Sequence, residues 1–185
     1  NPTEVAPSIA GDPGFEARIA AFRGPLDELR ARVIGETLVE LDGARSNIRS
    51  RETNLGNLVA DAMLPKAAGS GAQQVQEALE NGFSQVENGA GRFPQVAGIR
   101  VSYDPAAPAG NRVTALTFQN QNIDPAASYV VVTNNFMLGG GDGYSVFGQG
   151  TNSADTGFIL ADVVEEYITA NSPVNRLVPA PLRSR

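Results

Sequence analysis

The order of helix-type and strand-type segments is the feature of this sequence that most limits its fold. Apolar side chains three and four positions apart predict four helices, at residues 15–33, 53–63, 73–80 and 156–170. Alternating or continuous apolar residues predict four strands, at residues 35–43, 97–104, 111–118 and 128–134. Because these segments do not alternate regularly as βαβ units, the sequence predicts an α+β domain, with a layered mixed sheet and helices, rather than a Rossmann-type fold.

Local signals set the expected limits of these elements. Gly24-Pro25 should break or kink the first helix, Thr53 or Asn54 should cap the second, and Asn81-Gly82 should end the third. The last helix is expected to bury six apolar side chains: Ile159, Leu160, Val163, Val164, Tyr167 and Ile168. We divide the chain into an N-terminal arm and linker helix, residues 1–32, and a domain of residues 33–185 in which an internal segment is missing around residues 65–73.

Composition narrows the chemistry that the 185 residues can perform. The chain has no Cys and no His, so it lacks a disulfide framework, a thiolate nucleophile and the usual ligand of catalytic zinc. Its net charge of −6 argues against a nucleic acid or an anionic membrane as the main partner. No apolar run reaches the length of a transmembrane helix, and because the sequence does not begin with Met we expect it to be a piece of a longer protein.

Arginines before the second helix form the first candidate site. Arg49 and Arg51 precede the start of that helix, whose N-terminal amides favour anions, and a guanidinium beside them suits a phosphate or a carboxylate. The structural alternative is that Arg49 and Arg51 are solvated or paired with Glu52 across a turn.

The stretch "NNFMLGGGDGY", residues 134–144, forms the second candidate site directly after a predicted strand. The ring of Phe136 offers a stacking face for a base or sugar, and Gly140 and Gly141 let a ligand approach the backbone. Asp142 has a carboxylate that suits vicinal hydroxyl groups. The alternative is a glycine-rich turn in which Phe136 and Tyr144 are core residues and Asp142 caps a loop.

Three segments resemble a known family in the same order along the chain. "RSRETNLGNLVADAML", "GRFPQVAGIRVSYDPAAPAGNRV" and "YVVVTNNFMLGGGDGYSVF" are similar to the C-terminal, nucleoside-binding domain of 5'-nucleotidases, UDP-sugar hydrolases and 2',3'-cyclic-nucleotide phosphodiesterases. The resemblance implies a secreted, periplasmic or cell-surface metallophosphoesterase whose N-terminal domain holds two divalent metals. This chain would then have no cofactor of its own and would be inactive alone. By the family pattern, Phe136 would stack on the base, Asp142 would bind the ribose hydroxyls and Arg49 would reach the phosphate.

The chain also departs from the family pattern near residues 64–73. Family members have a long segment there, with a second aromatic plate, an Asn and another Arg, whereas "PKAAGSGAQQ" leads directly into the next helix. The loss of strands can leave an open sheet edge, which predicts a homo-oligomer or a protein partner at that edge. Two main hypotheses remain: a substrate-recognition domain that binds a nucleoside or nucleotide, and a binding or assembly module that has lost the pocket. Catalysis by Asp61 or Asp142 alone is disfavoured, because no paired acids accompany either residue.

Overall fold

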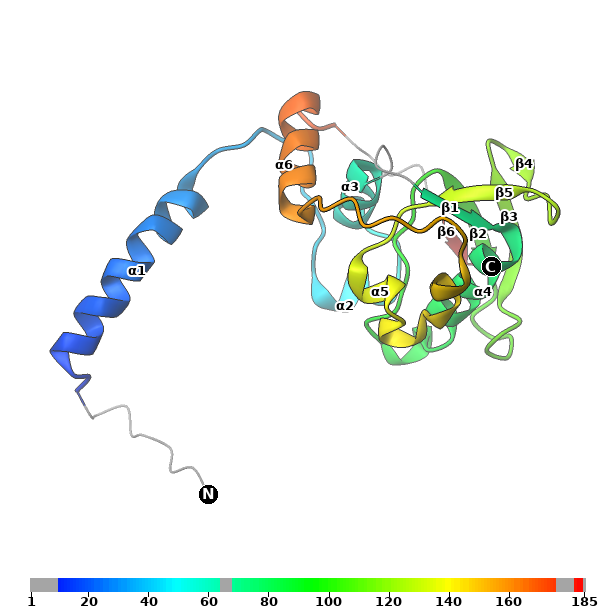
Figure 1. Ribbon diagram of the computed structural model, residues 1–185, viewed down its shortest axis with the longest axis horizontal. Coiled ribbons are helices and arrows are strands. Elements are labelled where there is room, and N and C mark those ends of the chain that lie inside the picture. The colour runs from blue at the N-terminus through cyan, green and yellow to red at the C-terminus, as the bar shows by residue number, and fades with distance from the viewer. Residues whose placement is uncertain (1–9, 64–67, 176–181, 185) are drawn as a thin grey trace, which may run out of the picture. The chain divides into compact units, whose positions relative to one another are not determined.

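The computed structural model describes residues 10–63, 68–175 and 182–184, and the chain divides into two units at Ile34 and Gly35 (Figure 1). The first unit contains the helix α1, Pro13–Ala31, whose N-cap Asp12 accepts hydrogen bonds from the amides of Gly14 and Phe15 at 2.8 and 3.1 Å. Of the predicted break or kink at Gly24-Pro25, the break is wrong, since α1 continues through Pro25. One proline removes a single helix hydrogen bond, and the remaining bonds of the 19-residue helix hold both sides together. Five large apolar residues of α1 are exposed: Phe15, Ile19, Phe22, Leu26 and Leu29.

A four-stranded sheet forms the centre of the second unit. Its order is β4 (Gln121–Asn122), β3 (Val113–Phe118), β2 (Ile99–Tyr103) and β6 (Leu182–Ser184). Strands β2 and β3 are antiparallel, whereas β2 and β6 are parallel. The sheet is therefore mixed and lies with helices in an α+β arrangement, which confirms the predicted fold class.

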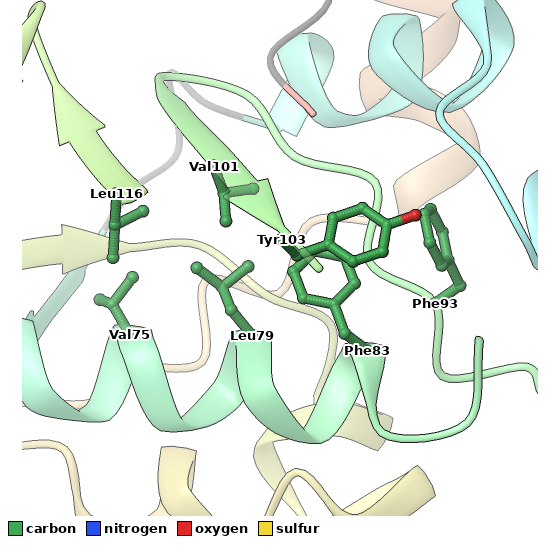
Figure 2. Close-up of a cluster of buried hydrophobic side chains, with 7 residues drawn as sticks. All are labelled: Val75, Leu79, Phe83, Phe93, Val101, Tyr103 and Leu116. Atoms are coloured by element: carbon green, nitrogen blue, oxygen red, sulfur yellow. The ribbon is translucent and has the colours of Figure 1, made fainter. Parts of the chain in front are cut away.

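Helix α4, Ala72–Phe83, packs on this sheet and completes the main core (Figure 2). Phe83 is fully buried and stacks on the ring of Tyr103, with the ring centroids 4.1 Å apart. Burial raises the pKa of Tyr103. The predicted face of β2 is also correct, because Val101 and Tyr103 are buried and Ile99 is half-buried. The alternating pattern in the sequence therefore correctly predicted which side chains of β2 face the core.

A separate two-stranded sheet joins β1, Ala68–Gly71, to β5, Ser128–Val131, in antiparallel register. Strand β1 was not predicted, because glycine, alanine and serine have low strand propensity. After β5 the chain forms three short turns, α5 (Asn135–Leu138), η3 (Gly141–Gly143) and η4 (Ser145–Gln149). A second cluster of buried residues beneath them contains Ala78, Tyr144, Val146 and Phe147. These turns carry the second candidate site.

Helices α3 (Asn54–Met63) and α6 (Leu160–Asn171) lie side by side (Figure 1). Thr53 caps α3 as predicted, since its Oγ1 accepts a hydrogen bond from the amide of Gly56 at 3.1 Å. The predicted burial of α6 is correct along the helix but wrong at its beginning: Val163 is buried and Val164, Tyr167 and Ile168 are half-buried, whereas Ile159 and Leu160 are 64% and 41% exposed. Helix α6 packs on α3 along one side only, so the side chains at its beginning stay open.

The predicted strand at residues 35–43 is also wrong. Its described backbone forms one isolated parallel bridge, between Thr37 and Val174. The amide of Val174 donates to the carbonyl of Glu36 at 2.8 Å, and the amide of Leu38 donates to the carbonyl of Val174 at 3.0 Å. The alternating pattern is present, but a strand needs a continuous partner, and among the described residues only Val174 pairs with this segment.

Candidate functional site

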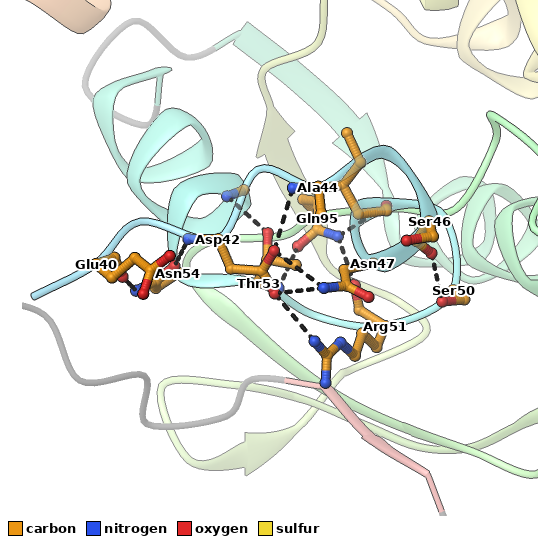
Figure 3. A network of polar contacts seen from close by, with 12 residues as sticks. Glu40, Asp42, Ala44, Ser46, Asn47, Ser50, Arg51, Thr53, Asn54 and Gln95 are labelled. Atoms are coloured by element: carbon orange, nitrogen blue, oxygen red, sulfur yellow. Dashed lines mark hydrogen bonds and ion pairs between the residues drawn. The ribbon is translucent and has the colours of Figure 1, made fainter.

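A polar network fixes the loop that carries the candidate arginines (Figure 3). Asp42 accepts two hydrogen bonds from Asn47 Nδ2, at 2.9 and 3.1 Å, and one from Arg51 Nη2 at 3.0 Å. The hydrogen bond from Asn47 is the main cause that lowers the pKa of Asp42. Arg51 is therefore occupied by an ion pair within the loop, although with Asp42 rather than with Glu52.

Gln95 ties the same loop to the rest of the domain. Its Nε2 donates to the carbonyls of Ile48 and Arg51 at 3.1 and 2.9 Å, and its Oε1 accepts from the amide of Thr53 at 3.1 Å. These bonds fix both ends of the segment around Arg49, which follows the short helix α2, Arg45–Ile48. Helix α2 was not predicted. The Arg49 guanidinium is half-buried and makes no hydrogen bond or ion pair within the described part of the chain.

The glycine-rich turn presents its side chains through an uncommon backbone conformation. Gly140 has φ +88°, a left-handed value that glycine adopts at low cost, and Asp142 follows in the left-handed region at φ +52°. Asn81 Nδ2, from α4, donates to the carbonyl of Asp142 at 3.1 Å. Asn81 in turn accepts a hydrogen bond from Arg92 Nη1 at 3.3 Å. A contact from outside the turn therefore holds Asp142 in place.

Arg49 and Asp142 meet at Gly91. A methyl group added to Gly91 would lie 3.4 Å from Asp142 Oδ2 and 3.6 Å from Arg49 Nη2. The cation and the carboxylate thus reach the same point of the surface from segments that are far apart in the sequence. Like Arg49, the Asp142 carboxylate has no hydrogen-bond partner among the described residues, so both charged groups are open to a ligand.

Phe136 lies over the backbone of Gly141. A methyl group at Gly141 would come within 2.5–2.6 Å of three ring atoms of Phe136, so only glycine leaves room for the ring. The Phe136 side chain is 59% exposed and offers a free aromatic surface. We call Arg49, Gly91, Phe136, Gly141 and Asp142 the Gly91 site.

Tyr144, the other aromatic residue of the motif, has a structural position. It is 3% exposed, stacks on Phe147 and donates from its hydroxyl to the carbonyl of Arg92 at 2.6 Å. Burial raises its pKa, so the hydroxyl stays protonated. The alternative that both Phe136 and Tyr144 are core residues is therefore correct for Tyr144 and wrong for Phe136.

The structure brings the five candidate residues together or next to each other, and it adds others. Arg49 and Asp142 converge, Phe136 covers Gly141, and Gly140 forms the turn between Phe136 and Asp142. Sequence reasoning missed Gly91 and Asn81, since a lone glycine before Arg92 and an asparagine at a helix end carry no pattern that links them to residue 142. No group of three or more acidic residues is placed to hold a metal ion in the described part of the chain.

A cavity of about 500 Å³ lies elsewhere, beside the end of β5 and the beginning of α6. It is lined by Asn134, Asn135 and Leu138 of the same turn, but not by Arg49, Phe136 or Asp142. The Gly91 site is therefore a set of open surface groups, distinct from this cavity.

Comparisons with known proteins agree on one family. A family model described as "5'-nucleotidase, C-terminal domain" matches residues 70–149. The chain is 33% identical over 204 residues to the trifunctional nucleotide phosphoesterase protein YfkN of Bacillus subtilis, covering 85% of this chain and 14% of YfkN. It is 28% identical over 228 residues to human 5'-nucleotidase, covering 91% of this chain and 40% of that protein.

A solved structure agrees with these matches. The 5'-nucleotidase precursor of Thermus thermophilus superposes with a TM-score of 0.85 at 30% identity, over 95% of this chain and 44% of that one. The chain thus spans less than half the length of each of these relatives. The alignments with YfkN and with the human protein are longer than the 185 residues of this chain, so both relatives contain residues that have no counterpart here.

Proposed function

Because this chain belongs to the family of 5'-nucleotidase C-terminal domains, we propose that it supplies the nucleotide-binding surface of a phosphoesterase. The convergence of Arg49 and Asp142 at Gly91, with neither group engaged by another described residue, carries the proposal. A guanidinium binds phosphate oxygens, a carboxylate accepts hydrogen bonds from vicinal hydroxyls, and an exposed ring stacks on a base. A nucleotide carries a phosphate, vicinal hydroxyls and a base, so it offers one partner to each of these three groups.

The proposal assigns the chemistry to another part of a longer protein. The Gly91 site contains a cation, a carboxylate and an aromatic ring, but no nucleophile beside a base. We therefore propose that a metallophosphoesterase domain outside this chain holds divalent metals and cleaves the phosphate ester. The same reasoning from the family makes the parent protein a secreted, periplasmic or cell-surface hydrolase.

Isothermal titration of the 185-residue chain with AMP and with adenosine, in the absence of metal, tests the role of Arg49. We expect AMP to bind more tightly than adenosine, because only AMP offers a phosphate to the guanidinium. Arg49→Ala should remove about 1.5–3 kcal/mol of AMP binding and leave adenosine binding unchanged. Arg45→Ala, at an exposed arginine of the adjacent α2, is the control and should bind both ligands like the parent chain. Equal affinities of the parent chain for AMP and adenosine would contradict the assignment of Arg49.

The missing residues favour a second candidate function. Relatives contain residues that this chain lacks, so part of a nucleotide pocket can be absent and the domain can serve as a binding or assembly module. The same titration separates the two functions. Absence of heat at millimolar AMP and adenosine, from a sample that unfolds cooperatively, would support the assembly module.

A further inference from the structure

The 500 Å³ cavity is bounded by the end of a strand and the beginning of a helix. Residues 131–135, at and beyond the end of β5, form one side, and residues 153–160 form the other. Met63, the last residue of α3, lies at the border. Phe147 and Val163 also line the cavity and have exposed fractions of 8% and 6%, so its lining includes buried apolar side chains.

Three consecutive apolar residues beside this cavity are open to solvent. Phe158, Ile159 and Leu160 line it and are 58%, 64% and 41% exposed. Single exposed apolar residues are ordinary on a protein surface, but a contiguous group that borders an apolar hollow marks an interaction site. The sequence predicted Ile159 and Leu160 to be buried, and their pattern is that of residues with a partner.

The cavity is also bordered by main chain that makes no strand pairing with any described residue. The register of β5 with β1 ends at the pair of Val131 and Ala68, so Val132 and Thr133 extend past the last described pair. On the other side, the amides and carbonyls of residues 151–156 make no main-chain hydrogen bond within the described part of the chain. A free strand edge beside an apolar hollow accepts an added strand, which supplies main-chain hydrogen bonds and side chains together.

Two further observations indicate the occupant. The relatives that share this fold contain residues without a counterpart here, so the architecture accommodates additional chain. The described lining contains one carboxylate, Asp155, and no Lys or Arg, in a chain of net charge −6. Charge complementarity therefore favours a basic side chain next to the apolar ones.

From this geometry we infer that the cavity binds an extended peptide segment of another polypeptide, which adds to β5 as a strand. Its alternate apolar side chains enter the hollow above Phe147 and Val163, and a Lys or Arg lies against Asp155. This site differs from the Gly91 site and does not depend on nucleotide binding. It gives the shortened domain a partner surface that the phosphoesterase function does not explain.

Fluorescence anisotropy with labelled synthetic peptides tests the inference. The probes are overlapping peptides that cover the YfkN residues without a counterpart in this chain, each paired with a scrambled peptide of the same composition. We expect one region to bind in a 1:1 complex and its scrambled version not to bind. Proline in place of one central residue of the binding peptide should abolish binding, because proline cannot donate to the strand edge.

Substitutions in this chain test whether the peptide binds at the cavity. Leu160→Glu places a charge at the border of the cavity and should weaken peptide binding at least tenfold; a glutamate in the first turn of α6 is compatible with the helix. Leu38→Glu changes another exposed leucine, 64% exposed and outside the described cavity lining, and should bind like the parent chain. No binding by any peptide, or binding unaffected by Leu160→Glu, would overturn the inference. A homodimer detected by light scattering that dissociates in Leu160→Glu would overturn it in favour of a second copy as the occupant.

Discussion

Arg112 and Arg49 show how differently one domain can use the same side chain. Arg112 is 6% exposed, and its guanidinium donates to Glu87 Oε2 and Oε1 at 2.8 and 3.3 Å. It also donates to the carbonyl of Phe83 and, from Nε at 3.0 Å, to that of Ala107. Arg49 is half-buried and makes no hydrogen bond within the described residues. The first arginine joins segments of the fold, and the second is available to a ligand.

The partners of the two arginines explain the difference. Glu87 next to Arg112 has a lowered pKa, chiefly because the guanidinium donates a hydrogen bond to it, and the same contact raises the pKa of Arg112. The nearby carboxylate of Glu80 accepts hydrogen bonds from the main-chain amides of Arg112 and Val113, both at 2.8 Å. Arg49 instead approaches Asp142 at Gly91 without an ion pair. Two opposite charges that converge without pairing, on a loop fixed by the hydrogen bonds of Gln95, are available to a ligand.

Removal of Arg112 should have the largest effect and should act on stability. Arg112→Met keeps much of the apolar stem but leaves the carbonyls of Phe83 and Ala107 without their donor. We expect a loss of about 2–4 kcal/mol in the free energy of unfolding, measured by urea denaturation. Arg100→Met, at an exposed arginine of β2, is the control and should stay within about 0.5 kcal/mol of the parent chain. A loss below about 1 kcal/mol for Arg112→Met would mean that water replaces the network, and the contrast with Arg49 would disappear.

Replacement of Phe136 should act on binding instead. The ring is 59% exposed, so Phe136→Ala should change the free energy of unfolding by no more than about 0.5 kcal/mol. If the ring stacks on a base, the affinity for both AMP and adenosine should fall by about 1–3 kcal/mol, as measured by titration calorimetry. Phe136→Tyr retains the stacking face and should keep most of the affinity. Unchanged binding by Phe136→Ala would remove the ring from the nucleotide site.

The sequence predicted the core elements well because their patterns are local. Spacing within β2 and α3 placed Val101, Tyr103 and Leu58 in the interior, and Thr53 capped α3 as its residue type predicts. The wrong predictions concern segments whose structure depends on contacts with distant parts of the chain. Residues 35–43 alternate like a strand, but within the described part of the chain they pair only with Val174. Ile159 and Leu160, at the beginning of α6, have the apolar pattern of buried residues but are exposed.

The site was predictable in part for the same reason. Phe136, Gly141 and Asp142 belong to one short motif, so their proximity follows from the sequence. The convergence of Arg49 with Asp142 at Gly91 depends on Gln95, Asn81 and Arg92, which connect segments that no periodicity relates. The resemblance to a family suggested Arg49 and Asp142 as binding residues, but the contacts that position these two residues are visible only in the tertiary structure.

A substitution at Gly91 should have the smallest effect of the three, and it should change ligand affinity without changing stability. Its backbone is not among the left-handed glycines, and a methyl group there makes ordinary contacts of 3.4 and 3.6 Å with Asp142 and Arg49. Gly91→Ala should therefore fold like the parent chain while the methyl group takes space that a ligand needs between the two charges. We expect AMP affinity to fall by about 1 kcal/mol with no change in the urea midpoint. Gly148→Ala, where an added methyl group meets nothing within 4 Å, should leave both quantities unchanged. Full AMP affinity in Gly91→Ala would mean that the ligand does not pass between Arg49 and Asp142, and that their convergence belongs to the fold, as the contacts of Arg112 do.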